Sequence, residues 1–320
     1  SHPLRSVMGD MPPDGVARLE LGPLSRQAVA RLADSPQQAA DVYTVTGGNP
    51  FLVTEFLAAP TSDVPTTVAD SVLARVARLS DAARRVAETV AIVPGRCERF
   101  VLGGFGSGAA DNIEECRRQG LVEVGPDAVW FRHELLRRAV EDALDPSDTR
   151  RLHGEVLAAL ADAGVDPARL AHHAALSGDV DALMRFAPAA ARSARSAAAH
   201  REAYSHYGRL WRHLDRFDED QRVALLTEYT AECYFVDDQS RAIRAAERAL
   251  HLYRRLGDRR GEGAMLRWIS RVHWWSGKRE EALSAGAEAV SMLESIPASA
   301  ELAMASSTLA QLHMLAHEAD

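Results

Sequence analysis

Hydrophobic residues recur at spacings of three and four along most of this chain, which gathers side chains on one face of an α-helix. Between residues 25 and 60 the spacing predicts three short helices, with apolar positions at Val29, Leu32, Ala33, Ala39, Val42, Tyr43, Phe51, Leu52, Phe56 and Leu57. A further stripe, after a Pro- and Thr-rich linker, consists of Val68, Val72, Val76 and Leu79. Ser80 is placed to cap the next helix, which we expect to run to Val93.

Strand-like patterns occur near the start of the chain and again before its middle. VARLEL alternates within a Pro- and Gly-rich opening segment, residues 1–24, and looks like the last strand of a sheet lying mostly upstream. LVEV and AVWFR flank Gly125, Pro126 and Asp127, which predicts a β-hairpin, with a helix from Glu134 onward. Helices followed by a small hairpin predict a winged-helix module over residues 66–146.

Internal similarity marks the remainder, residues 147–320, which is rich in Ala and helical in pattern. Arg241–Leu252 matches Glu281–Met292 at an offset of 40, and Glu202–Trp211 matches the first of these more weakly. The aligned pairs include Ala242 with Ala282, Ala249 with Ala289, Leu250 with Val290, and Ala203 with Ala242. Small residues at fixed positions let paired helices approach closely, so we expect stacked helical hairpins. Because the period exceeds the ~34 residues of a tetratricopeptide repeat, we expect a TPR-like α-superhelix.

Composition excludes several classes of protein. With 320 residues and 47% hydrophobic content, the chain can bury the cores of two or three domains. A net charge of −8 argues against a nucleic-acid surface in this segment. Three widely spaced cysteines support neither a disulfide framework nor a zinc site, and we expect a reducing, cytoplasmic setting without a membrane partner. The chain begins without Met and ends inside a helical pattern, so we expect a middle piece of a longer protein.

Two motifs that would carry catalysis are incomplete. The one lysine, Lys278, is followed by Arg279 where a P-loop needs Ser or Thr, so we expect no ATP hydrolysis by this segment alone. His133 and Glu134 begin an HExxH pattern, but Arg137 stands where the second histidine must bind zinc. We therefore expect neither catalytic nor metal-binding residues here.

The glycine cluster Gly103–Ala109 contains a GxGxxA pattern, with Glu123 downstream at the position of a ribose-binding acid. A dinucleotide site also needs a buried strand before the glycines and alternating strands and helices after them. Helical patterns dominate the residues downstream of this cluster, so we expect a flexible loop between winged-helix elements.

Histidines and tryptophans are frequent in the second half. We expect surface or capping roles for His172, His173, His200, His206 and His213. The tryptophans of the repeats are expected to fill seams between hairpins, and they are Trp211, Trp268, Trp274 and Trp275. Adjacent residues on a helix point in different directions, so one member of the last pair must face outward, where it could line a partner or ligand surface.

The segment TGGNPFLVTEF, residues 46–56, predicts a tight corner between two helices. Gly47 and Gly48 suit the left-handed end of one helix, and Pro50 suits the first turn of the next. Asn49 then lies at the corner itself. On residue types alone, this segment fits a plain interhelical turn.

Six segments in order resemble the large ATP-dependent LuxR-type transcriptional regulators, members of the STAND class of P-loop NTPases. They are LELGPLS, TGGNPFLVTEFL, VADSVLARVARLS, GLVEVGPDAVWFRHELLRRAV, RRLHGEVLAAL and LAHHAALSGD, between about Leu19 and about Asp179. The resemblance implies the end of an upstream NTPase core over residues 1–24, a helical lid over 25–60, the winged helix over 66–146 and TPR-like repeats over 147–320. The P-loop, the Walker B segment and a DNA-binding helix-turn-helix would lie outside this sequence.

The resemblance also implies a nucleotide site. Gly48, Asn49 and Pro50 resemble the GxP motif of the lid, whose backbone packs against the base. His133, with Arg132 before it, resembles the winged-helix histidine that reaches the β-phosphate of ADP, and a helix N-terminus independently favours an anion. This sequence has Phe131-Arg132 and Glu134 around the histidine where the motif has Met and Asp, so a packed structural histidine is the other interpretation.

The implied mechanism is a switch. ADP would hold core, lid and winged helix together until an inducer or protein on the repeats, with exchange for ATP and Mg²⁺, allows self-association on a promoter. DNA would be contacted only through a C-terminal domain. Two alternatives stay open, namely a signalling enzyme with the same front end, linked to an adenylate cyclase or kinase, and a TPR-like scaffold without a nucleotide role. Residues beyond Asp320 would separate a regulator from a signalling enzyme.

Overall fold

The computed structural model describes residues 22–58 and 68–317, and the chain divides into two compact units, Ser1–Leu144 and Asp145–Asp320. Each unit is described by itself. The fold is mainly α, as predicted, with short helices where the lid was expected and a small sheet where the winged helix was expected in the first unit, and a TPR-like helical array in the second. The strand expected at VARLEL lies outside the described residues.

Three short helices open the described part of the first unit, and all three were predicted. They are α2 (Arg26–Leu32), α3 (Pro36–Thr46) and α4 (Pro50–Ala58). The side chains of Ser25 and Ser35 cap the first two by accepting from backbone N–H groups three residues on. Their small core consists of Val29, Val42, Val53 and Phe56, with Leu24, Tyr43 and Leu57 packed against it.

The winged-helix segment follows the linker. Its elements are α5 (Val68–Val76), α6 (Asp81–Ala91), β1 (Cys97–Glu98), the 3₁₀ helix η2 (Arg99–Gly108), α7 (Ala109–Arg118), β2 (Val122–Val124), β3 (Ala128–Phe131) and α8 (Glu134–Asp142). Ser80 caps α6 as predicted, although the helix ends two residues before Val93. The predicted hairpin is confirmed, with Val122 opposite Phe131 and Val124 opposite Val129.

Two features of this segment were not predicted. β1 pairs with β3 through Cys97 and Val129, which makes an antiparallel three-stranded sheet in the order β1-β3-β2. The expectation of a flexible loop at Gly103–Ala109 was wrong, because a 3₁₀ helix runs to Gly108 and α7 begins at Ala109. Val101 and Leu102 are buried within that 3₁₀ helix, so apolar packing orders a segment whose glycines alone indicate a loop.

A buried face of α6 forms the centre of the winged-helix core. Its buried residues are Ala83, Val86, Ala87, Thr89, Val90 and Ala91. The Cys116 thiol on α7 lies 3.1 Å from the carbonyl oxygen of Ala83, and burial raises the pKa of Cys116 to about 12. This thiol stays protonated and behaves as a small apolar side chain.

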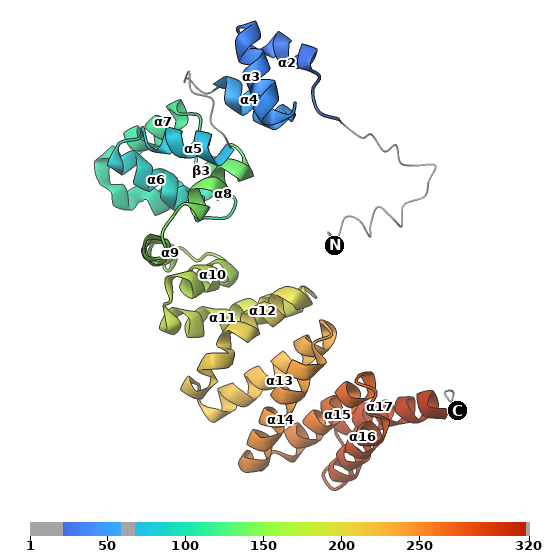
Figure 1. Cartoon of the computed structure of the whole chain (residues 1–320). Coiled ribbons are helices and arrows are strands. Elements are labelled where there is room, and N and C mark those ends of the chain that lie inside the picture. The colour runs from blue at the N-terminus through green and yellow to red at the C-terminus, as the bar shows by residue number, and fades with distance from the viewer. Residues whose placement is uncertain (1–21, 59–67, 318–320) are drawn as a thin grey trace. The chain divides into compact units, whose positions relative to one another are not determined.

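The second unit is a series of consecutive helices in which neighbours along the chain lie side by side (Figure 1). They are α9 (Pro146–Leu160), α10 (Pro167–Ser177), α11 (Val180–Ser196), α12 (His200–Leu210), the 3₁₀ helix η3 (Trp211–Arg216), α13 (Glu219–Phe235), α14 (Gln239–Leu256), α15 (Arg259–Trp275), α16 (Arg279–Glu294) and α17 (Ala300–His317). The matched segments fall on α12, α14 and α16. Their aligned alanines, Ala203, Ala242 and Ala282, are all fully buried, as close helix contacts require.

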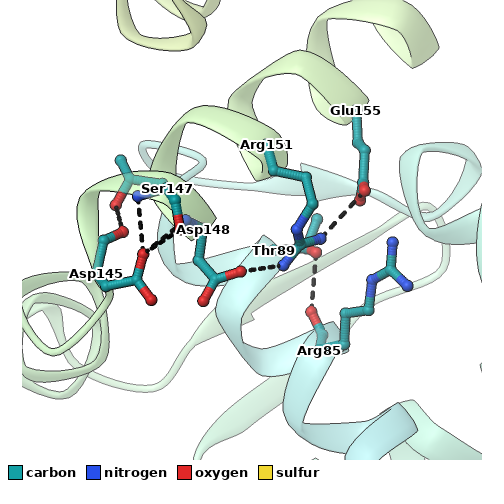
Figure 2. Close-up of polar contacts among 8 residues, drawn as sticks. Arg85, Thr89, Asp145, Ser147, Asp148, Arg151 and Glu155 are labelled. Carbon is teal, nitrogen blue, oxygen red and sulfur yellow. Dashed lines mark hydrogen bonds and ion pairs between the residues drawn. The ribbon is translucent and has the colours of Figure 1, made fainter.

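Aspartate side chains cap the N-termini of several helices in this array. Asp145 begins α9, and its carboxylate accepts from the backbone N–H groups of Ser147 at 2.7 Å and Asp148 at 2.9 Å (Figure 2). Hydrogen bonds to this carboxylate lower the pKa of Asp145 to about 2, and the bond from the Ser147 hydroxyl is the largest cause. Figure 2 also shows Arg151 bridging Asp148 and Glu155 on the same helix, at 2.6 and 3.1 Å. The same kind of cap opens five later helices of the unit, at Asp166, Asp179, Asp218, Asp238 and Asp258.

The expectation of surface or capping roles was wrong for two of the histidines. His173 and His206 are buried, at 1% and 5% exposure, and His153 is also buried at 1%. The Nδ1 atoms of His153 and His173 lie 2.7 Å apart. Both residues fall on the apolar stripes of their helices, His153 with Val156, Leu157 and Leu160. An imidazole whose polar atoms find a partner can occupy such a position.

The tryptophans of the repeats lie at partly exposed positions. Trp268 contacts the rings of Tyr234 and Phe235, and Trp211 contacts Tyr229. Trp275 is 66% exposed, so it is the outward member of its pair. Its indole N–H donates to the Tyr234 hydroxyl at 2.7 Å.

Within the described ranges, the helices include none that is both long and apolar enough to cross a membrane.

Candidate functional site

The predicted corner joins α3 to α4 through two glycines in the left-handed region. Gly47 ends α3 with φ of 59°, and its N–H donates to the Tyr43 carbonyl at 2.9 Å. Gly48 follows with φ of 79°. The Gly48 N–H donates to the Thr46 hydroxyl at 3.2 Å, so this buried residue is held by side chain and backbone together.

Asn49 and Pro50 begin the next helix. The Asn49 side-chain oxygen accepts from the Leu52 N–H at 3.3 Å, and its carbonyl accepts from the Val53 N–H at 2.9 Å. Pro50 occupies the first helical position, where a missing N–H costs nothing. Both residues are exposed, while Gly48 between the helices is buried. The corner therefore presents the Asn49-Pro50 backbone at the surface of the lid helices.

Leu24 fixes the corner from the other side. Its N–H donates to the Gly48 carbonyl at 2.7 Å, and the Arg26 guanidinium lies 4.8 Å from the centre of the Tyr43 ring. The segment before α2 is thus fastened to the turn between α3 and α4.

Arg132 and His133 lie at the junction of β3 with α8. The Arg132 N–H donates to the Leu121 carbonyl at 3.1 Å, which extends the hairpin pairing to the last residue before the turn. His133 is the N-cap residue, with φ of −141° and no side-chain capping bond. Its carbonyl accepts from the N–H groups of Leu136 and Arg137 at 3.1 and 3.2 Å. Arg132 is exposed and His133 is half-buried.

The charges around this junction bear on anion binding. Glu134 would repel an anion, but its carboxylate is paired with the Arg137 guanidinium through hydrogen bonds of 2.8 and 2.9 Å. These hydrogen bonds lower the pKa of Glu134. The exposed Arg132 guanidinium and the N-terminal end of α8 attract an anion, and the His133 imidazole can donate a hydrogen bond to one. The junction can thus accept a phosphate chemically.

The corner and the junction lie on either side of the linker at residues 59–67, which falls outside the described residues. Gly48, Asn49 and Pro50 come together in one turn, and Arg132 and His133 in another. Their joint contact with a nucleotide stays a prediction. Over the described ranges there is no group of three His, Cys, Asp or Glu side chains that could hold a metal ion.

Comparisons with known proteins add little to this geometry. No family model matches the chain, and no curated protein matches it. Among solved structures, it is similar to a Signal Transduction ATPase with Numerous Domains (STAND) protein with a tetratricopeptide repeat sensor from Pyrococcus horikoshii. The sequence identity is 14% and the TM-score is 0.44, over 96% of this chain and 59% of that chain. The chain therefore spans less than two thirds of that protein, and a likeness of this degree carries no functional information.

Proposed function

We propose that this chain is the regulatory and sensor segment of an ATP-dependent, LuxR-type transcriptional regulator of the STAND class, acting in the cytoplasm. The observation that carries the proposal is the order of three modules in one chain. A helical lid with a Gly48-Asn49-Pro50 corner precedes a winged helix with Arg132 and His133 at its hairpin-to-helix junction, and helical repeats come after them. That order and these residues match what the resemblance implies.

In this proposal, the exposed backbone of the corner contacts the adenine base, and the His133 imidazole and Arg132 guanidinium contact the β-phosphate of ADP. The P-loop and the Mg²⁺ ligands belong to an upstream NTPase core of the same polypeptide. The repeats receive an inducer or a protein partner, and DNA is bound by a domain after Asp320. ADP holds the switch closed, and its exchange for ATP opens it and allows self-association.

The test is made on the full-length protein, with His133→Ala as the variant. A hydrogen bond to a charged group contributes about 1.5–3 kcal/mol, so we expect ADP to bind roughly 10- to 100-fold more weakly and basal activity to rise. The ADP that co-purifies with the protein and its dissociation constant are measured. His313→Ala, on the exposed face of α17, is the matched control. Equal ADP retention by both variants would remove His133 from the nucleotide site.

A further inference from the structure

A pocket lined by arginines opens between α13, α14 and the start of η3 in the second unit. Its volume is about 470 Å³, within the range of small-molecule sites. The residues around it are Trp211, Arg222, Arg244, Glu247, Arg248, His251, Leu252 and Arg255. Six of these belong to one face of α14, at spacings of three and four, while Leu252 is buried and forms an apolar part of the wall.

Positive charge exceeds negative charge in this pocket, although the whole chain has a net charge of −8. Four guanidinium groups line it, and the acids beside them are Glu247, Asp215 and Glu219. Arg255 is paired with Glu219. Asp215 is 83% exposed and lies 3.6 Å from Arg222 and 3.9 Å from Arg248. Pairs this exposed and this long are worth about 0–1 kcal/mol, so a bound anion can replace them at little cost.

Two of the arginines, Arg244 and Arg248, have N–H donors that an anion can reach. The Arg248 guanidinium lies 4.8 Å from the centre of the Trp211 ring. Cation–π contact of this kind uses the face of the guanidinium and leaves its in-plane N–H groups to donate. Arg244 takes part in none of the ion pairs and hydrogen bonds recorded among the described residues, and its side chain is exposed. The Arg244 and Arg248 guanidinium groups can donate hydrogen bonds to one phosphate or carboxylate from two sides.

Arg222 has a different role. Its guanidinium donates to the backbone carbonyls of Leu214 at 3.0 Å and Phe217 at 2.9 Å, which fixes η3 against α13. The residue therefore forms a rigid, positively charged wall. Trp211, at the first position of η3, packs against the Tyr229 ring of α13 with ring centres 6.0 Å apart, so the aromatic wall does not depend on a ligand.

We infer that this pocket binds a small organic anion, with its phosphate or carboxylate between Arg244 and Arg248 and its apolar part over Leu252 and the Trp211 edge. The volume exceeds what an isolated phosphate group fills, which favours an organic body. Binding follows from the pocket itself. Only its role as the input to the sensor rests on the proposed function.

The experiment monitors the five tryptophan indole N–H signals of the 320-residue chain by ¹⁵N NMR, with the Trp211 signal assigned from Trp211→Phe. Pyrophosphate and citrate are the probes for a phosphate and a carboxylate head. We expect one of them to shift the Trp211 signal saturably with a dissociation constant of about 1 mM or tighter, and to bind more weakly as salt is added. The probe that binds more tightly identifies the head group.

Arg244→Gln and Arg248→Gln are each expected to weaken that binding about 10- to 100-fold. Arg201→Gln removes the same charge from an exposed position ten residues, or about 15 Å, before Trp211 along the chain, and should bind like the parent. Folding of each variant is checked by circular dichroism, and Arg255→Gln replaces either one that unfolds. No saturable shift with either probe, or an equal loss in Arg201→Gln, overturns the inference. The proposed function is tested separately by ADP retention, so either can fail alone.

Discussion

The Nδ1 atoms of His153 and His173 lie 2.7 Å apart in the interior between α9 and α10. At that distance one nitrogen must donate and the other must accept, because two N–H groups would collide. His172 is close by, with its ring centre 5.6 Å from that of His153. The pair is therefore stable only when at least one imidazole is neutral. The stability of the second unit should depend on pH for this reason.

Burial, with the nearby His172 as a smaller cause, lowers the pKa of His153 from 6.5 to about 4. In the unfolded chain this histidine takes up a proton near pH 6.5, whereas in the folded chain it does so only near pH 4. The unfolded state then binds more protons between these values, so stability is full above about pH 6.5 and falls as the pH drops toward 4. At about 1.4 kcal/mol per pKa unit, the loss is of the order of 3 kcal/mol.

An NMR titration of the histidine ring protons measures this directly. The His153 signal should titrate near pH 4, and urea unfolding at pH 7.5 and pH 5 should show the second unit weaker at the lower pH. His153→Gln should flatten that dependence in part, since burial also lowers the pKa of His206. His313→Gln, at an exposed site, should leave it unchanged. A His153 midpoint near 6.5 would contradict the prediction.

Much of the fold follows from local patterns, and the misses have physical causes. Ser80, the Gly125–Asp127 turn and the Gly47-Gly48 corner are short-range signals, and each has its expected structure. β1 is two residues long and exists only because β3, thirty residues away, offers an edge, which no local pattern reveals. The burial of His173 and His206 was missed because we judged them by residue type and not by position, although both lie on apolar stripes that were visible in the sequence.

The candidate site divides in the same way. The corner geometry was predictable because glycine, asparagine and proline each have one strong local preference there. The Arg132-His133 junction was predictable as a hairpin-to-helix turn. The contact between Leu24 and Gly48 was not predictable, because it depends on a close approach between segments that only the folded backbone shows. Contact of these residues with a nucleotide stays a prediction, because no local pattern in them fixes it.

Gly48 gives a direct test of the corner. A Cβ added there would lie 2.2 Å from the Leu24 carbonyl oxygen, and φ is 79°, so Gly48→Ala should destabilise the lid helices by at least about 2 kcal/mol. Gly47→Ala is the control. It has a similar φ of 59° but nothing within 4 Å of the added carbon, so it should cost only about 1 kcal/mol. Hydrogen exchange of the Leu24 amide, which donates to Gly48, reports the local stability. Equal protection in both variants would show that the steric contact is relieved.

Arg137 gives the corresponding test for the winged helix. Its side chain is 12% exposed, and it donates to Glu134, Glu141 and the carbonyl of Ala91 at the end of α6. Arg137→Met keeps the aliphatic stem but leaves that carbonyl and two carboxylates without their donor, so we expect a loss of about 2–3 kcal/mol in the free energy of unfolding of this segment. Arg138→Met removes the same charge from the exposed neighbouring position and should change it by less than about 0.5 kcal/mol. Hydrogen exchange of the α6 and α8 amides measures both, and because α8 carries His133 at its N-cap, Arg137→Met should also loosen the junction. If the two variants lose equal protection, Arg137 acts through charge alone and the tie to Ala91 contributes nothing.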